Sequence, residues 1–161
     1  MTAVTSGAAV VTLPSDTQIL ITREFAAPRH LVWRAWTEPD LIRRWWSGDR
    51  GEVTSVTNDL RVGGAWRWVM RANPGFEVAF HGEYLEIEPD ERLVRTEVFE
   101  GAPDAAAVST LSLTEAGGRT TTTILVQHSS QQNRDAHLNS GMESGMQSSL
   151  ALLEQVATSL P

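Results

Sequence analysis

The sequence predicts an α+β domain in which a curved antiparallel β-sheet carries two short helices and a long C-terminal helix over its concave face, enclosing a hydrophobic cavity. Three observations predict this fold class. From Glu52 to Gln127, short segments of alternating apolar and polar residues follow one another, separated by turn residues, as in an antiparallel meander. Short helical patterns precede this run, and a long one follows it. A sheet with one apolar face must be covered, and only the last helix is long enough to cover it.

The N-terminal part predicts one strand and two short helices. Thr17–Phe25 alternates β-branched and polar residues, which favours a strand. Pro28 fits the first turn of a helix whose apolar residues recur at helical spacing up to Trp36. Pro39 ends that helix and opens a second one, which we expect to run to Trp46.

Further strands follow, and one of them carries an unusual aromatic face. In the strand over residues 64–71, Trp66, Trp68 and Met70 share one face. The pattern alone leaves open whether this face is concave or convex; the concave alternative is favoured because the convex one would expose a large apolar patch. Gly82 is expected to form a bulge that bends its strand. The predicted strands are Val53–Thr57, Ala65–Arg71, Phe76–His81, Leu93–Phe99, Val108–Leu113 and Thr120–Gln127.

The C-terminal segment, from Asn133 onward, predicts one long amphipathic helix. Gly141 and Gly145 lie inside this pattern, where each costs about 1 kcal/mol relative to alanine. We expect a packing reason for them, either close approach to the sheet or space for a ligand. The apolar stripe consists of Leu138, Met142, Met146, Ser149, Leu153 and Val156.

Length, charge and composition limit the function classes. A chain of 161 residues fits a single domain, predicted over residues 17–161 after a flexible leader over residues 1–16. The net charge of −7 disfavours nucleic-acid and anionic-membrane partners. The absence of Cys excludes disulfides and thiolate sites. No apolar run is long enough to span a membrane, and the first residues lack a signal-peptide pattern, so we expect a cytoplasmic protein. We also expect no cofactor.

Several motifs occur together in a characteristic order. They are Phe25-Ala26-Ala27-Pro28, Val32-Trp33-Arg34-Ala35-Trp36-Thr37-Glu38-Pro39, Arg44-Trp45-Trp46, Asp59-Leu60-Arg61-Val62-Gly63-Gly64-Ala65-Trp66, Gly82-Glu83-Tyr84-Leu85-Glu86-Ile87-Glu88-Pro89, Glu91-Arg92-Leu93-Val94 and the final Gly145-Met146…Leu150…Leu153. In this order they resemble the activator-of-heat-shock-chaperone-ATPase-like family of the START-related SRPBCC superfamily, over nearly all of residues 17–156. The resemblance implies a helix-grip fold with a cavity. Relatives of this kind include small-molecule carriers, polyketide cyclases, co-chaperone domains and resistance proteins.

One motif departs from the family pattern. The terminal helix of this family usually has Gly followed by Trp, whereas this chain has Gly145-Met146. Methionine is slimmer and more flexible than tryptophan. If Met146 points inward, the pocket is larger or more adaptable than a tryptophan would leave it.

The residues that we expect to bind a ligand are aromatic or carry sulfur. We assign Trp33 and Trp45 to the core instead, where they would hold the two short helices. The predicted ligand-binding residues are Trp36 and Trp46 near the mouth, Trp66, Trp68, Met70 and Phe80 on the sheet, and Met142, Met146 and Ser149 on the last helix.

The sequence contains fewer candidate catalytic residues than candidate ligand-binding residues. His81, Glu83 and Tyr84 are the candidates for acid–base chemistry, because a carboxylate can tune an imidazole pKa. A polar pair at the outer rim is the favoured reading of His81 and Glu83. The other histidines, His30, His128 and His137, lack ligand spacing, so no metal site is predicted. No nucleophile-elbow motif supports a hydrolase.

The sequence therefore favours a protein that binds or sequesters a bulky, hydrophobic, aromatic small molecule without converting it. A polyketide-like natural product in a self-resistance role is the finer hypothesis. Two alternatives remain: a polyketide cyclase or hydratase that uses the same cavity, and a co-chaperone-like interaction module. The sequence does not decide whether the chain contacts a second copy of itself or a chaperone.

Overall fold

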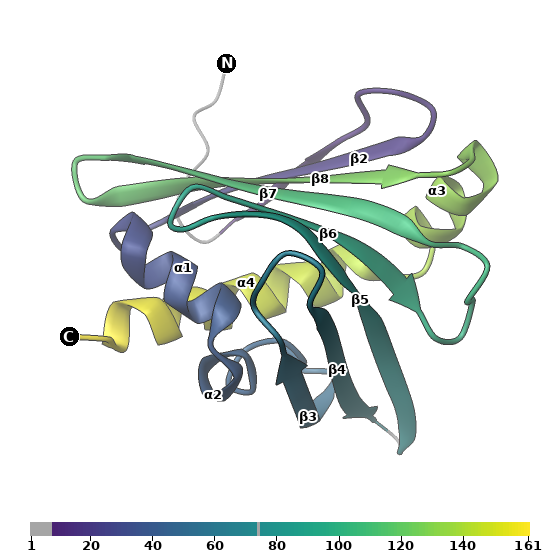
Figure 1. Cartoon of the computed structure of the whole chain (residues 1–161), viewed down its shortest axis with the longest axis horizontal. Coiled ribbons are helices and arrows are strands. Elements are labelled where there is room, and N and C mark those ends of the chain that lie inside the picture. The colour runs from purple at the N-terminus through teal and green to yellow at the C-terminus, as the bar shows by residue number, and fades with distance from the viewer. Residues whose placement is uncertain (1–7, 74) are drawn as a thin grey trace.

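The computed structural model describes residues 8–73 and 75–161, and its architecture confirms the predicted α+β class. A single antiparallel sheet has eight strands in the order β1-β2-β8-β7-β6-β5-β4-β3. The sheet bends around α4, with α1 and α2 at one end and α3 at the other (Figure 1). The strands are β1 (Val10–Thr12), β2 (Gln18–Phe25), β3 (Gly51–Asn58), β4 (Ala65–Ala72), β5 (Phe76–Glu88), β6 (Arg92–Phe99), β7 (Ala107–Ala116) and β8 (Arg119–His128), and the helices are α1 (Arg29–Thr37), α2 (Pro39–Ile42), α3 (Gln131–Leu138) and α4 (Met142–Ser159).

The first two strands occupy one side of the sheet. β2 pairs with β8, so it lies between β1 and the last strand of the meander. The range expected to be a flexible leader contains β1, whose Val10 to Thr12 pair with β2. Ala9 is buried, and its backbone exchanges two hydrogen bonds of 2.9 Å with the side chain of Gln147 on α4. Residues 1–7 of that range lie outside the described residues.

Helix α2 is shorter than the sequence indicated. It ends at Ile42, and the chain continues to Arg50 in successive turns rather than as a helix reaching Trp46. In these turns the backbone N–H of Trp45 donates to the carbonyl of Ile42 (3.2 Å). The Trp45 indole donates to the carbonyl of Ala35 on α1 at 2.8 Å, which joins the turn segment to that helix.

The aromatic face of β4 points inward. Trp66 and Trp68 are only 2% and 1% exposed and belong to the core, which decides in favour of the concave alternative. Met70 follows in the same alternation but is half-buried and lies outside that core.

Gly82 does not form the expected bulge. β5 runs without interruption through it, and the register shift falls further along, between Tyr84 and Glu86. Gly82 pairs with Trp66, whose indole N–H donates to the carbonyl of Thr96 at 3.1 Å. A Cβ at position 82 would clash with that carbonyl and lie 2.7 Å from the indole nitrogen. The glycine is required because the Thr96 carbonyl and the Trp66 indole that bonds to it both lie against this position.

The C-terminal helical segment is broken in two. Ser130 caps α3 by accepting the N–H of Asn133 at 3.1 Å, and Gly141 separates α3 from α4 with a φ of +83°. The Arg50 side chain lies beside both Gly141 and Gly145. Its guanidinium donates to the Gly141 carbonyl (2.7 Å) and to Ser144 Oγ (2.6 Å), and a Cβ at Gly145 would lie 2.9 Å from Arg50 Nε. The left-handed φ of +83° explains Gly141, and the close approach of Arg50 explains Gly145.

Among the described residues, no helix is both long and apolar enough to cross a membrane.

Candidate functional site

A cavity of about 100 Å³ lies between the sheet and the helical segments. Strands β4, β5 and β6 supply most of its wall, the turn segment after α2 supplies one residue, and α3 closes one end. Its lining residues are Trp46, Trp66, Trp68, Phe80, Arg95, Glu97 and His137. One part of the wall is aromatic and the other part is polar.

The aromatic part consists of rings in edge-to-face contact. Trp46 lies 5.6 Å from Trp68 and 5.8 Å from Phe80, measured between ring centroids, with interplanar angles of 78° and 86°. Trp66 lies 5.3 Å from Trp68. Each such pair contributes about 0.5–1.5 kcal/mol beyond the area that it buries. Asn58 accepts the indole N–H of Trp68 at 2.9 Å, so this ring is fixed in position.

The polar part is built around Arg95. Its guanidinium carbon lies 4.0 Å from the Trp66 ring and 4.5 Å from the Trp68 ring, a cation–π arrangement on two faces. Glu97, two residues further on the same strand, lies 3.5 Å from Arg95 Nη2. Burial raises the pKa of the neighbouring Tyr84 phenol, and the positive charge of Arg95 offsets part of this rise.

Two histidines meet at the end of the cavity formed by α3. His128 on β8 and His137 on α3 are joined by a hydrogen bond of 3.0 Å between Nε2 and Nδ1. Burial lowers the pKa of both imidazoles, and Glu97 opposes this effect. Both are therefore neutral at pH 7. In the described part of the chain, no three His, Asp or Glu side chains are arranged to hold a metal ion.

The structure brings four of the predicted ligand-binding residues together around this cavity: Trp46, Trp66, Trp68 and Phe80. Met142 and Met146 on α4 are half-buried and pack against the same core without lining the cavity. Ser149 donates to the carbonyl of Trp46 at 2.8 Å and so holds the turn segment against α4.

The remaining two predicted residues lie elsewhere. Trp36 is buried in the core, with its ring 4.8 Å from that of Trp45, rather than at a cavity mouth. Met70 lies beyond the end of the cavity wall on β4.

The candidate acid–base residues are not assembled. His81 and Glu83 are exposed, whereas Tyr84 is buried in the core. His81 Nδ1 lies 2.8 Å from Glu100, which also accepts two hydrogen bonds of 2.9 Å from Arg67. These hydrogen bonds lower the pKa of Glu100 to about 2. His81 therefore belongs to a surface ion-pair network and not to a pair with Glu83.

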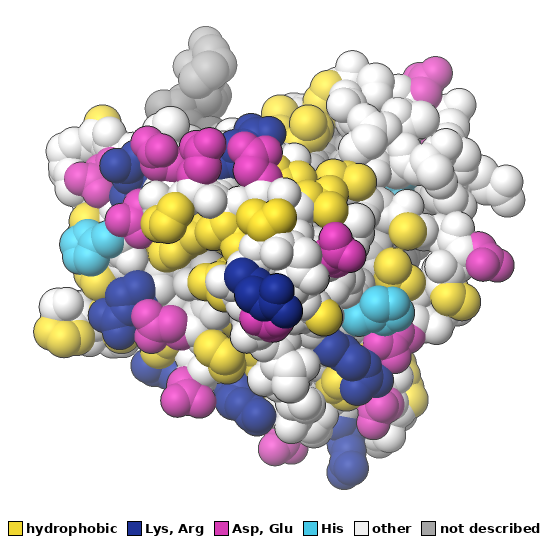
Figure 2. Space-filling view, viewed as in Figure 1, with side chains coloured by type: hydrophobic (Ala, Val, Ile, Leu, Met, Phe, Trp, Pro, Cys, Tyr) yellow, Lys and Arg dark blue, Asp and Glu magenta, His cyan; other side chains and the backbone are white. Residues whose placement is uncertain are grey.

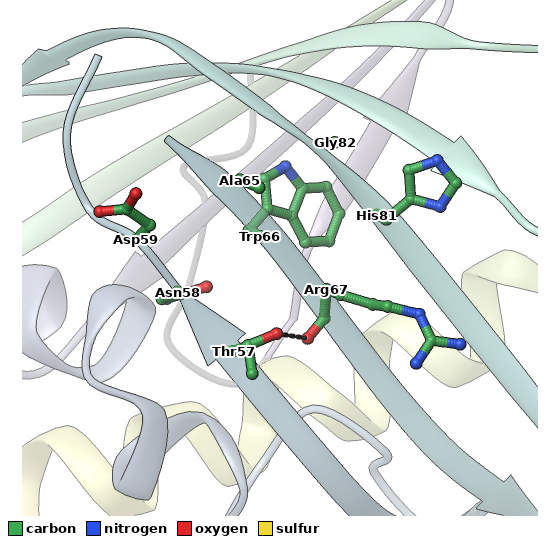
Figure 3. Close-up of a pocket in the computed structure, with 8 residues that line it drawn as sticks. All are labelled: Thr57, Asn58, Asp59, Ala65, Trp66, Arg67, His81 and Gly82. Atoms are coloured by element: carbon green, nitrogen blue, oxygen red, sulfur yellow. Dashed lines mark hydrogen bonds between the residues drawn. The ribbon is translucent and has the colours of Figure 1, made fainter. Parts of the chain in front are cut away.

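A second hollow, of about 510 Å³, is open to solvent beside this network. Arg67 and His81 extend from neighbouring strands there, and the Thr57 hydroxyl donates to the carbonyl of Arg67 (Figure 3). On the face of the molecule shown in Figure 2, acidic and basic side chains are interspersed. We place the candidate site in the smaller cavity, because it is less open and because four aromatic rings and the buried Arg95 line it.

Sequence reasoning missed Arg95, Glu97 and His137. The alternation around Arg95 gave a weak signal, because Leu93, Arg95 and Glu97 share a strand face and Leu93 is a core residue. Nothing local indicated the pairing of His128 with His137, which requires α3 to fold back over the end of β8.

Comparison with known proteins agrees with this architecture. The family model described as "Activator of Hsp90 ATPase homolog 1-like protein" matches residues 26–158. A protein from Rhodobacter sphaeroides is 25% identical, with a TM-score of 0.88 over 95% of this chain and 100% of its own. A protein from Nitrosomonas europaea is also 25% identical, with a TM-score of 0.82 over 91% of this chain and 97% of its own.

A protein from Arthrobacter aurescens has the same identity, 25%, and a TM-score of 0.84 over 94% of this chain and 92% of its own. No curated protein matches the sequence. The family match spans most of the chain, and the solved structures share its sheet and its terminal helix. The chain therefore belongs to the activator of Hsp90 ATPase homolog 1-like family, within the SRPBCC (START-like) group of folds.

Proposed function

We propose that this protein binds an aromatic, largely apolar small molecule in the cavity between β4, β5, β6 and α3, and that it does so without converting the ligand. The observation that carries the proposal is the partly open cavity whose wall includes four aromatic rings, those of Trp46, Trp66, Trp68 and Phe80. Ligand sites are concave, mainly apolar and aromatic, and contain a few placed polar groups. A fold alone does not define a function, whereas the residues of this wall define which ligands can bind.

The size of the cavity limits what enters without movement. A volume of about 100 Å³ is smaller than the cavity of about 150 Å³ that accepts benzene in a protein core. Binding of a bulky ligand therefore requires side chains to move. Met142 and Met146 support such movement, because both are half-buried and methionine changes rotamer readily.

The non-catalytic character is supported by the arrangement of ionisable groups. His81 is exposed and paired with Glu100, so it cannot reach a ligand in the cavity. Tyr84 is buried, and burial raises its pKa, which makes the phenolate form costly at pH 7. Neither candidate has the geometry that proton transfer to a bound molecule demands.

Isothermal titration calorimetry with a size series, phenol, 1-naphthol and 1-hydroxyanthraquinone, tests the proposal. We expect saturable binding with one site, tighter for the larger members, because each added ring buries more apolar surface. Absence of saturable binding across the series would reject a ligand-binding role. Binding of phenol alone would retain a ligand site but reject a bulky ligand.

Two matched variants locate the binding site. Phe80→Trp adds bulk to the cavity wall and should weaken binding of 1-naphthol at least tenfold. Phe76→Trp makes the same change at the exposed end of β5 and should leave the affinity unchanged. Equal effects of the two substitutions would place the site outside the cavity.

A role in self-resistance is a finer proposal about the same cavity. It predicts that expression of the chain raises the concentration of a toxic aromatic natural product needed to stop growth of a sensitive bacterium. Phe80→Trp should abolish that protection. Protection that is unaffected by the substitution would separate the resistance role from the cavity.

A further inference from the structure

The polar end of the cavity contains a hydrogen-bond donor with no partner. Arg95 is 9% exposed, and its Nη1 is buried without a partner in hydrogen-bond geometry among the described residues. The buried hydroxyl of Tyr84, whose pKa is raised by burial and lowered in part by Arg95, also lacks a partner in that geometry, so a ligand acceptor would compete with this hydroxyl for the guanidinium. The rings of Trp66 and Trp68 hold the guanidinium in place, at 4.0 and 4.5 Å. A buried donor left unpaired is destabilising, so an acceptor that reaches Nη1 would gain the full benefit of the hydrogen bond.

The charge of Arg95 is already balanced. Glu97 lines the same cavity, lies 3.5 Å from Nη2 and is half-buried. The pair has no net charge, so an added anion would meet the repulsion of the Glu97 carboxylate in a poorly screened environment. A neutral acceptor gains the hydrogen bond from Nη1 without this repulsion.

The histidine pair adds a neutral donor at the same end. His128 Nδ1 is buried without a partner, which favours the tautomer that keeps a lone pair there and a proton on Nε2. That proton then bonds His137 Nδ1, and the proton of His137 remains on Nε2. The residues that line the polar end thus include Arg95 with its unpartnered Nη1, the neutral His137, and the Glu97 carboxylate that is paired with Arg95.

We infer that the cavity selects neutral aromatic carbonyl compounds, such as aryl ketones and quinones, whose oxygen accepts a hydrogen bond from Arg95 Nη1 while the ring contacts Trp46, Trp68 and Phe80. This inference rests on the proposed ligand-binding function and names its substrate class. The conjugated carbonyl matches both halves of the site, because it places a planar apolar ring and an uncharged acceptor a short distance apart.

Three monocyclic probes of similar size test the inference by calorimetry: acetophenone, its hydrocarbon analogue α-methylstyrene, and benzoate. The wild-type protein should bind acetophenone about tenfold more tightly than α-methylstyrene, the factor expected for one hydrogen bond to a charged donor. Benzoate should bind more weakly than acetophenone. These ratios need no variant, so the test does not depend on whether a substituted chain folds.

Arg95→Met removes the donor and retains an unbranched side chain over the two tryptophans. It should reduce the affinity for acetophenone to that for α-methylstyrene. Arg92→Met is the matched control, because Arg92 lies on the same strand but pairs with Glu86 outside the cavity. Glu97→Gln should raise the affinity for benzoate.

The outcomes separate the inference from the function on which it rests. Equal wild-type affinities for acetophenone and α-methylstyrene would overturn the carbonyl assignment while leaving an apolar binding site. Benzoate as the tightest ligand would overturn it in favour of an anion site. Failure of all three probes to bind would reject the ligand-binding function and the inference with it.

Discussion

Replacing Gly82 with alanine tests whether the Trp66 ring lies where the structure places it. A Cβ at this position would clash with the Thr96 carbonyl and lie 2.7 Å from Trp66 Nε1. Either the two strands must separate or the tryptophan must leave its place. Its hydrogen bond to Thr96, 3.1 Å long, is lost in both cases.

The expected loss of stability has two parts. Forcing an extra carbon into a packed core costs about 1–3 kcal/mol, and losing the indole hydrogen bond costs about 1 kcal/mol more. The free energy of unfolding should therefore fall by about 2–4 kcal/mol. For a chain of this length each kcal/mol lowers Tm by about 2–4 °C, which gives a decrease of about 4–16 °C.

Urea denaturation followed by far-ultraviolet circular dichroism measures this loss without relying on tryptophan emission. Gly117→Ala is the control. Gly117 lies in open space with a φ of +60°, so alanine there introduces only backbone strain of about 1–2 kcal/mol. A loss for Gly82→Ala no larger than that of the control would refute the close packing of the Thr96 carbonyl and the Trp66 ring against this glycine.

Two further predictions concern pH. The pKa of Glu100 is lowered to about 2 from its ordinary 4.5, so its stabilising interactions with Arg67 and His81 are complete above pH 4.5 and are lost as the pH falls toward 2. Glu100→Gln should flatten the decline of stability over that range, measured by urea denaturation at several pH values, and an unchanged profile would contradict the network. Burial lowers the pKa of His128 and His137 below 6.5, so the unfolded chain binds more protons as the pH falls below that value and stability declines. His137→Gln should reduce this decline. Carbon-detected NMR titration should show both imidazoles less than half protonated at pH 6.5, whereas ordinary titration of both rings would exclude the buried pair.

The architecture was predictable because its signals are local. Each strand shows its own alternation, and the last helical segment shows its own apolar stripe. These patterns identified the meander and the helix that covers it without knowledge of any partner, and placed Trp66 and Trp68 on one strand face, which the structure shows to be the inward one. Local sequence patterns did not explain two of the glycines. Gly82 and Gly145 were recognised as unusual, but their reasons are the Trp66 ring and the Arg50 side chain, which come from other elements.

The sequence by itself determined the fold class, the family resemblance and an aromatic wall, because periodicity and residue type depend only on neighbours along the chain. The tertiary structure alone decided the chemistry of the cavity. Arg95 from β6 meets Trp66 and Trp68 from β4, and His128 from β8 meets His137 from α3. Such contacts depend on strand order and helix placement, which set the direction of every inward side chain at once. The pattern of one strand does not predict which charged side chain will contact which aromatic ring on another strand.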